Sequence, residues 1–152
     1  MKQVLFVCTG NTCRSPMAEA AFNVLAGAHG IDWRAGSAGT CAWPGGPASN
    51  MAQRAVAEIG GDLGGFRSRP LSRAMIEESD LIVAMTADHR EDILAGYPSA
   101  AGKTRLLLEF APGNEENVAD PYGGSLDLYR YTLEAMMPAL DGLIGKMSKN
   151  LI

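Results

Sequence analysis

The sequence predicts a single-domain α/β fold, a three-layer sandwich in which a four-stranded parallel sheet has helices on both faces. Short apolar segments alternate with longer segments of helical periodicity, and this alternation is typical of parallel sheets. Two apolar segments, 4–7 and 81–85, are continuous, as expected of strands that are covered on both sides. A chain of 152 residues is long enough for one domain with its own core, so we take 1–152 as one unit.

The expected elements follow from the spacing of apolar residues and from the positions of glycine, proline and capping residues. Apolar residues three and four positions apart predict helices, and Ser49 and Ser125 are expected to cap two of them. Clusters of glycine and proline predict loops. In chain order we expect a strand over 4–7, a helix from Met17 to Gly27 or Gly30, a strand over 33–38, a loop over 39–47, a helix over 49–59, an irregular segment over 64–70, a short helix over 71–79, a strand over 81–85, a helix over 87–95, a strand over 104–108, a loop over 111–124 and a long helix over 125–147.

The segment 8–15 lies between the first strand and the first helix. Gly10 and Asn11 are residue types that tolerate positive φ, as a tight loop requires. Such a loop points successive backbone N–H groups at one centre, and the dipole of the following helix adds positive character. The segment therefore predicts a phosphate loop after the first strand. The residues expected to form it, besides the two with chemical roles, are Thr9, Gly10, Asn11, Thr12, Cys13 and Ser15.

Cys8 and Arg14 are the chemically active residues of this phosphate loop. The planar guanidinium of Arg14 can hold two phosphate oxygens at once. The same positive field favours the thiolate form of Cys8, which is the nucleophilic form of cysteine. We expect the hydroxyl of Ser15 to donate to the Cys8 sulfur, a role compatible with capping the helix. A cysteine followed after five residues by Arg-Ser, directly behind a strand, is a specific signal.

This segment resembles the active-site loop of the low-molecular-weight protein tyrosine phosphatase family. Members carry the loop at the N-terminus and a general-acid aspartate in an Asp-Pro pair far downstream, and this chain has Asp120-Pro121-Tyr122. Length and element order agree as well, so the resemblance covers essentially the whole chain. It implies that Cys8 attacks phosphorus to give a phosphocysteine, and that Asp120 protonates the leaving group and then activates water. Apart from this resemblance, an aspartate before proline is an ordinary turn residue.

The resemblance also bears on the substrate, which is expected to be a phosphorylated protein. Tyrosine-specific members usually carry a bulky apolar residue at the position of Thr12, whereas the phosphoarginine-specific bacterial branch carries threonine. The run from Asp120 to Ser125 resembles that branch too. Trp43 and Tyr122 are expected to wall the site, around either a phosphotyrosine ring or a stacked guanidinium. We favour phosphoarginine, because a hydroxyl can bond the polar phosphoramidate end, and keep phosphotyrosine as the alternative.

Other residues are expected to support or protect the loop. The family suggests that Asn11 holds the loop in shape, with Ser37 as its partner. Relatives carry a histidine near Phe66, so part of the polar support is altered in this chain. In the family a second loop cysteine can form a reversible disulfide with the nucleophile, which makes Cys13 either a redox partner or a small buried residue.

Composition excludes several classes of function. The net charge of −4 argues against nucleic-acid binding, no apolar run approaches the length of a membrane span, and no signal peptide is visible. An odd number of cysteines, three, with one in a reactive setting, favours a reducing cytoplasm. Cys41 has no assigned role. We expect a monomer without metal or cofactor, because Arg14 and the loop supply the positive charge and no spacing suggests zinc.

Three other functions compete with a phosphatase. A phosphoryl carrier with an N-terminal cysteine should keep its phosphocysteine, whereas Arg14 and Asp120 together favour turnover. An arsenate reductase on this scaffold would need two further cysteines, and residues 75–95 contain none. A dinucleotide-binding domain would carry Gly-x-Gly-x-x-Gly after the first strand, and this pattern is absent.

Overall fold

A parallel four-stranded sheet forms the centre of the computed structural model, which describes residues 1–152. The strand order is β2-β1-β3-β4, so the two strands with continuous apolar sequence lie in the middle. This confirms the predicted α/β class. The strands are β1 (Lys2–Cys8), β2 (Trp33–Gly39), β3 (Leu81–Ala84) and β4 (Thr104–Leu106).

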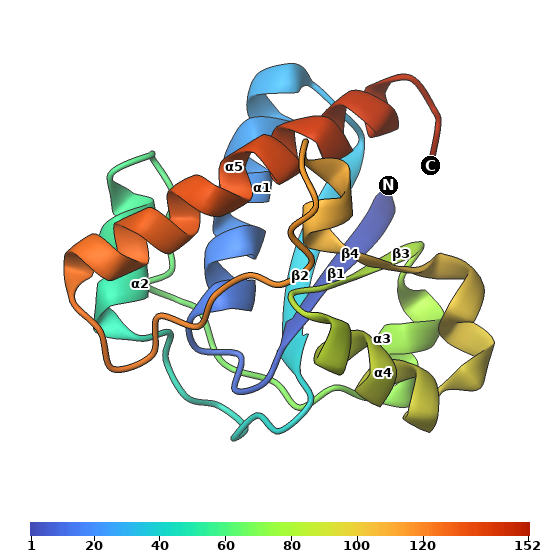
Figure 1. Ribbon diagram of the computed structural model, residues 1–152, viewed down its shortest axis with the longest axis horizontal. Coiled ribbons are helices and arrows are strands. Elements are labelled where there is room, and N and C mark those ends of the chain that lie inside the picture. Colours follow the sequence, from blue (N-terminus) through green and yellow to red (C-terminus); the bar gives the residue numbers. More distant parts are fainter.

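Helices cover both faces of the sheet (Figure 1). On one side α1, α2 and α5 enclose the larger core, and on the other side α3 and α4 enclose a smaller one. The helices are α1 (Arg14–His29), α2 (Asn50–Ala57), α3 (Arg73–Glu78), α4 (Ala87–Gly96) and α5 (Leu126–Ser148), with short 3-10 helices η1 (Pro98–Lys103) and η2 (Leu107–Phe110). Ser49 and Ser125 cap α2 and α5, as expected.

Alternate residues of β1 supply the two cores. Val4 and Phe6 point to the side of α1, and the ring of Phe6 packs against that of Phe22, with centroids 5.8 Å apart. Leu5 and Val7 point to the side of α3 and α4. Because successive side chains of a strand face opposite ways, a strand with helices on both sides must be apolar at every position.

Several boundaries differ from the sequence prediction, β1 begins at Lys2, and the 3-10 helix η1 was not predicted. Two of the differences bear on the site and on the sheet. The first helix begins at Arg14, not Met17, so the arginine of the phosphate loop belongs to its first turn. The fourth strand ends at Leu106, where 104–108 was expected, and the chain turns into η2. The carboxylate of Glu109 accepts the backbone N–H of Leu106 at 2.7 Å, which closes this turn and ends the strand.

Side chains protect the free edge of the sheet at β2. The amide of Asn23 accepts from the backbone N–H of Ala35 at 3.0 Å and donates to its carbonyl at 3.4 Å. The guanidinium of Arg69 donates to the carbonyl of Ser37. These bonds satisfy groups that would otherwise attract another strand.

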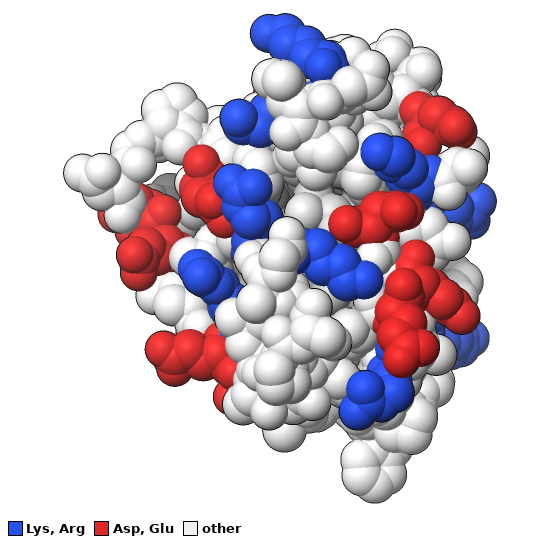
Figure 2. All heavy atoms as spheres, turned by 90° about the vertical axis from the view of Figure 1, so that its right-hand side faces the viewer, with Lys and Arg blue, Asp and Glu red and all other residues white.

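The surface carries charges of both signs. Figure 2 shows basic and acidic side chains interspersed on one face, with no broad area of a single sign. This face therefore offers no extended positive surface of the kind that binds nucleic acid. None of the helices is at once long enough and apolar enough to cross a membrane.

Candidate active site

Distant parts of the chain meet at the carboxyl ends of the strands, where parallel sheets bind their ligands. Cys8 is the last residue of β1, the phosphate loop follows it, and Asp120 approaches from the segment before α5. Together they enclose a cavity of about 230 Å³. The cavity is lined by Cys8, Thr9, Gly10, Thr12, Cys13, Arg14, Asp120 and Tyr122.

The sulfur of Cys8 is buried and lies 2.9 Å from the hydroxyl oxygen of Ser15. Ser15 belongs to the first turn of α1, so the expected cap role is not observed, and the N-cap residue is Cys13. Cys13 makes no side-chain capping bond. The backbone N–H groups at the start of α1 therefore donate to no capping side chain. They are left free to bind an anion that sits above the Cys8 sulfur.

Asn11 shapes the loop from within. Its backbone is left-handed, with φ of 55°, and its side chain is fully buried. The amide group donates to the hydroxyls of Ser15 and Ser37 at 2.8 and 3.0 Å. Its oxygen accepts the backbone N–H of Arg69 at 2.9 Å. One amide therefore ties the loop to α1, to β2 and to the segment before α3.

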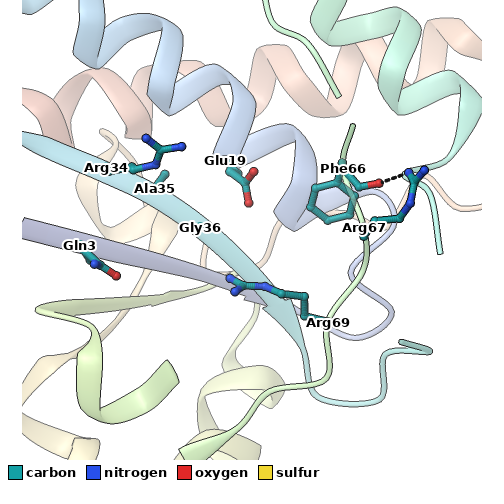
Figure 3. Close-up of a pocket in the computed structure, with 8 residues that line it drawn as sticks. All are labelled: Gln3, Glu19, Arg34, Ala35, Gly36, Phe66, Arg67 and Arg69. Atoms are coloured by element: carbon teal, nitrogen blue, oxygen red, sulfur yellow. Dashed lines mark hydrogen bonds between the residues drawn. The ribbon is translucent and has the colours of Figure 1, made fainter. Parts of the chain in front are cut away.

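A second row of polar groups supports Asn11 from behind. Ser37 donates to Glu19 of α1 at 2.8 Å, and burial raises the pKa of this carboxyl. Figure 3 shows Glu19 and Arg69 facing each other across a hollow beside β2, with the ring of Phe66 nearby. The polar support in this chain thus comes from Glu19 and Arg69, while Phe66 offers an apolar ring.

Arg14 and Asp120 lie together at the mouth of the cavity. The guanidinium of Arg14 is buried, donates to the carbonyl of Val118 at 3.0 Å and lies 3.6 Å from the Asp120 carboxylate. The Asp120 side chain is 53% exposed, and its other oxygen accepts the N–H of Tyr122 at 3.0 Å. An anion gripped by Arg14 would therefore have a carboxyl group beside it, open to solvent.

A histidine on α4 contacts the phosphate loop. The ring of His89, in the first turn of α4, lies 2.7 Å from the Thr9 hydroxyl and 2.9 Å from the Thr86 hydroxyl. Burial and, next, the charge of Arg14 lower the pKa of His89. Sequence reasoning missed His89. Its signal was its place five residues after the end of the central strand β3, at the edge of the sheet where the loop lies.

Cys13 lies behind the loop, away from bulk solvent. Its sulfur is 3.2 Å from the hydroxyl of Tyr129 on α5, and both side chains are buried. Burial and then the contact with Cys13 raise the pKa of Tyr129. All three cysteines are free thiols, and Cys41 is exposed outside the cavity.

Of the two aromatic residues expected to wall the site, Tyr122 lines the cavity and Trp43 does not. Tyr122 lines the cavity and is 78% exposed, so one face of its ring is free. Trp43 is 83% exposed and is not among the lining residues, so only Tyr122 forms a wall of the cavity itself. Thr12 lines the cavity and is half-buried. No group of three or more His, Cys, Asp or Glu side chains is placed to hold a metal ion.

Comparisons with known proteins agree on one family. The family model described as low molecular weight phosphotyrosine protein phosphatase matches residues 3–151. A Bacillus subtilis protein named protein-arginine-phosphatase is 38% identical over 147 residues, 97% of each chain. A structure of the arginine phosphatase YwlE with a phosphorylated active-site serine superposes with a TM-score of 0.92 at 37% identity, over 97% of this chain and 96% of that one. A low molecular weight protein tyrosine phosphatase from T. tengcongensis gives 0.91 at 43% identity, over 96% and 99%.

Proposed function

The chain belongs to the low molecular weight phosphotyrosine protein phosphatase family, and we propose that it removes phosphate from phosphorylated arginine side chains of proteins. The observation that carries this proposal is the cavity that joins Cys8, Arg14 and Asp120, with Thr12 among the residues that line it. The similarity to proteins named protein-arginine-phosphatase supports it. Three free thiols suit a reducing cytoplasm as the site of action.

The first half of the reaction is an attack by the Cys8 thiolate on phosphorus. A sulfur–phosphorus bond forms while the bond from phosphorus to the substrate nitrogen breaks, and Asp120 donates a proton to that nitrogen. Arg14 and the loop N–H groups hold the three equatorial oxygens, where negative charge collects in the transition state. The hydroxyl of Ser15, 2.9 Å from the sulfur, stabilises the thiolate.

The second half hydrolyses the phosphocysteine. Asp120, now a carboxylate, takes a proton from water as the water oxygen attacks phosphorus, and the sulfur leaves as thiolate. Inorganic phosphate is released and the enzyme returns to its starting state. A phosphoryl carrier would stop before this half, so release of phosphate in excess of enzyme separates the two functions.

Thr12 is the residue that we assign to substrate choice. Its hydroxyl can accept or donate a hydrogen bond at the nitrogen end of a phosphoramidate, directly or through water, whereas an aliphatic side chain cannot. The free face of Tyr122 can stack on a planar guanidinium. It can equally stack on a phenyl ring, so a phosphotyrosine phosphatase remains the second candidate, in line with the relatives named tyrosine phosphatases.

Rates on matched phosphoarginine and phosphotyrosine peptides test the proposal. We expect the wild type to favour phosphoarginine in kcat/KM. Thr12→Val and Thr12→Ile should each lower that preference about tenfold, the factor for one hydrogen bond to a polar substrate group, and Thr12→Ser should keep it. A wild type that prefers phosphotyrosine would make the second candidate the function. An unchanged preference in Thr12→Val and Thr12→Ile would show that Thr12 does not set the substrate.

Cys13 is proposed to protect the nucleophile. A peroxide would oxidise the Cys8 thiolate to a sulfenic acid and would itself be reduced to water or an alcohol. Attack of the Cys13 thiol on the sulfenic sulfur, with loss of water, would then give a disulfide that a cellular thiol can reduce. Both cysteines are among the residues that line the same cavity, which supports this pairing. Tyr129 would hold the Cys13 sulfur in place.

A further inference from the structure

His89 joins the phosphate loop to an element that otherwise takes no part in binding phosphate. One ring nitrogen contacts the Thr9 hydroxyl at 2.7 Å, and the other contacts the Thr86 hydroxyl at 2.9 Å. Thr86 is itself fixed, because it caps α4 and accepts the backbone N–H of His89 at 3.1 Å. His89 is only 4% exposed, so the histidine end of both bonds is shielded from water.

Thr9 is the first residue after the nucleophile, so its position sets the start of the phosphate loop. Its backbone carbonyl accepts the N–H of Cys41 at 2.9 Å, and Thr9 is one of the residues that line the cavity. A threonine hydroxyl at an exposed loop position would ordinarily rotate freely. Here a rigid ring, anchored in a helix that packs on β3 and β4, fixes it.

The residues just before Asp120 are held by the same end of α4. The side-chain oxygen of Asn117 accepts the N–H of Ala87 at 2.8 Å, and the N–H of Val118 donates to the carbonyl of Met85 at 2.9 Å. The start of α4 therefore holds the general-acid segment on one side and, through His89, the phosphate loop on the other. A shift of either would change the distance between the sulfur and the acid.

We propose that His89 is a positioning residue: it bridges Thr9 to Thr86 and so sets the first turn of the phosphate loop against the segment that carries Asp120. The proposal rests on the phosphatase activity inferred above. His89 does not touch the reacting atoms, and its effect reaches them through Thr9. The bridge requires two polar atoms at the ends of a planar group, which glutamine also offers and alanine does not.

The charges around the ring give the proposal a second signature. The groups that act on it are Arg14 from α1, Asp120 from the mouth of the cavity, and Asp88 and Asp92 from α4. Of these, Arg14 opposes the imidazolium form. A dianion bound to Arg14 offsets that repulsion, so phosphate in the cavity should raise the pKa of His89. By linkage, protonation of His89 should tighten phosphate binding.

The experiment uses His89→Gln, His89→Ala and Thr9→Val, with His29→Gln as the matched control. His29 is the other histidine and lies at the far end of α1. An aryl phosphate is the substrate probe and inorganic phosphate is the binding probe. We expect kcat/KM to fall about five- to tenfold in His89→Ala and Thr9→Val, the factor for one hydrogen bond, and to stay within about twofold in His89→Gln and His29→Gln.

Three further measurements separate positioning from a general loss of structure. The double variant Thr9→Val with His89→Ala should be no slower than either single one, because both remove the same bond. In proton NMR of the wild type, phosphate should move the His89 titration to higher pH and leave His29 unchanged. Phosphate inhibition should also gain less at low pH in His89→Gln than in the wild type, since only the wild type gains a nearby charge.

Each contrary outcome has a distinct meaning. Equal rates for the wild type, His89→Ala and Thr9→Val would overturn the bridge. A His89→Gln variant as slow as His89→Ala, or additive losses in the double variant, would also overturn it, because the hydrogen bonds would then not be the cause. A wild type that releases no phosphate from either the aryl probe or a phosphoarginine peptide would instead refute the phosphatase activity on which the proposal rests.

Discussion

At the scale of the residue, Asn11 shows how a single side chain holds the site in shape. Its left-handed backbone allows the tight turn after Cys8, and glycine could make the same turn. Glycine could not make the three hydrogen bonds to Ser15, Ser37 and Arg69. Asparagine is the residue type that tolerates this backbone and also carries both a donor and an acceptor.

Asp120 is the residue to which we assign the acid–base step. Asp120→Asn keeps the acceptor for the Tyr122 N–H but removes the proton, so the loop should stay in place. We expect aryl phosphates with poor leaving groups to be hydrolysed about 100-fold more slowly, and those with good leaving groups to lose much less, because only the former need the acid. Steady-state rates across a leaving-group series check this.

Asp127→Asn is the matched control for Asp120→Asn. It makes the same chemical change at a side chain that is 87% exposed in the first turn of α5 and pairs with Arg130. Its rates should match the wild type for every leaving group. Equal slowing of good and poor leaving groups in Asp120→Asn would exclude Asp120 as the acid.

At the scale of the element, two glycines of α5 illustrate how position within a helix sets the role of one residue type. A side chain at Gly142 would run into the backbone carbonyl of Phe110 in η2. At Gly145, one turn further on, a side chain would meet nothing within 4 Å. The first glycine lets α5 pack closely on η2, whereas the second only weakens the helix.

These two positions predict opposite changes in stability. Gly142→Ala should lower the free energy of unfolding by about 1–3 kcal/mol, because a backbone group must move. Gly145→Ala should raise it by about 0.5–1 kcal/mol, since alanine is the better helix former. Urea denaturation of both variants measures the difference. A change of the same sign in both would mean that helix propensity, and not the contact with η2, decides the outcome.

At the scale of the whole molecule, buried His89 and half-buried Glu19 give stability an opposing dependence on pH. The pKa of His89 is lowered in the fold from its ordinary 6.5, so below 6.5 the unfolded chain binds more protons and stability falls as the pH falls. The pKa of Glu19 is raised from 4.5, mainly by burial. Between 4.5 and that higher value the folded chain binds more protons, so stability rises as the pH falls.

Two neutral variants should separate these contributions. His89→Gln should lose less stability than the wild type as the pH falls below about 6.5, because it has no imidazole to protonate. Glu19→Gln should lack the gain on acidification, and it keeps an acceptor for Ser37. Urea midpoints from about pH 5 to about pH 8 measure both effects. Curves parallel to the wild type would show that neither group titrates differently on folding.

The sheet was predictable because its signal is local. Continuous apolar runs marked β1 and β3, and capping serines marked the starts of α2 and α5 within one residue. Strand ends were less predictable. β4 stops at Leu106 because the Glu109 side chain takes the N–H there, and nothing in the apolar run of residues 106–108 signals that bond.

The candidate site was predictable where neighbours in sequence create the chemistry. Cys8, Arg14 and the loop between them act over a few residues, so their order alone indicates an anion site. Arg69 and His89 escaped because each joins the site across a long sequence separation, and Glu19 escaped because it joins the site only through Ser37 of β2. Trp43 was expected to wall the cavity, and the fold leaves it exposed outside the lining.

By itself the sequence determined the alternating pattern of strands and helices and the anion-binding loop, because both depend on local spacing and on the backbone preferences of glycine, asparagine and proline. Only the tertiary structure decided what stands around that loop. Parallel strands bring their carboxyl ends to one edge, and the packing of α4 and of the segment before α5 sets which side chains face one another there. The contact of His89 with Thr9 joins residues far apart in the sequence, and so does the contact of Arg14 with Asp120. Such contacts form only when the elements that carry the residues pack together.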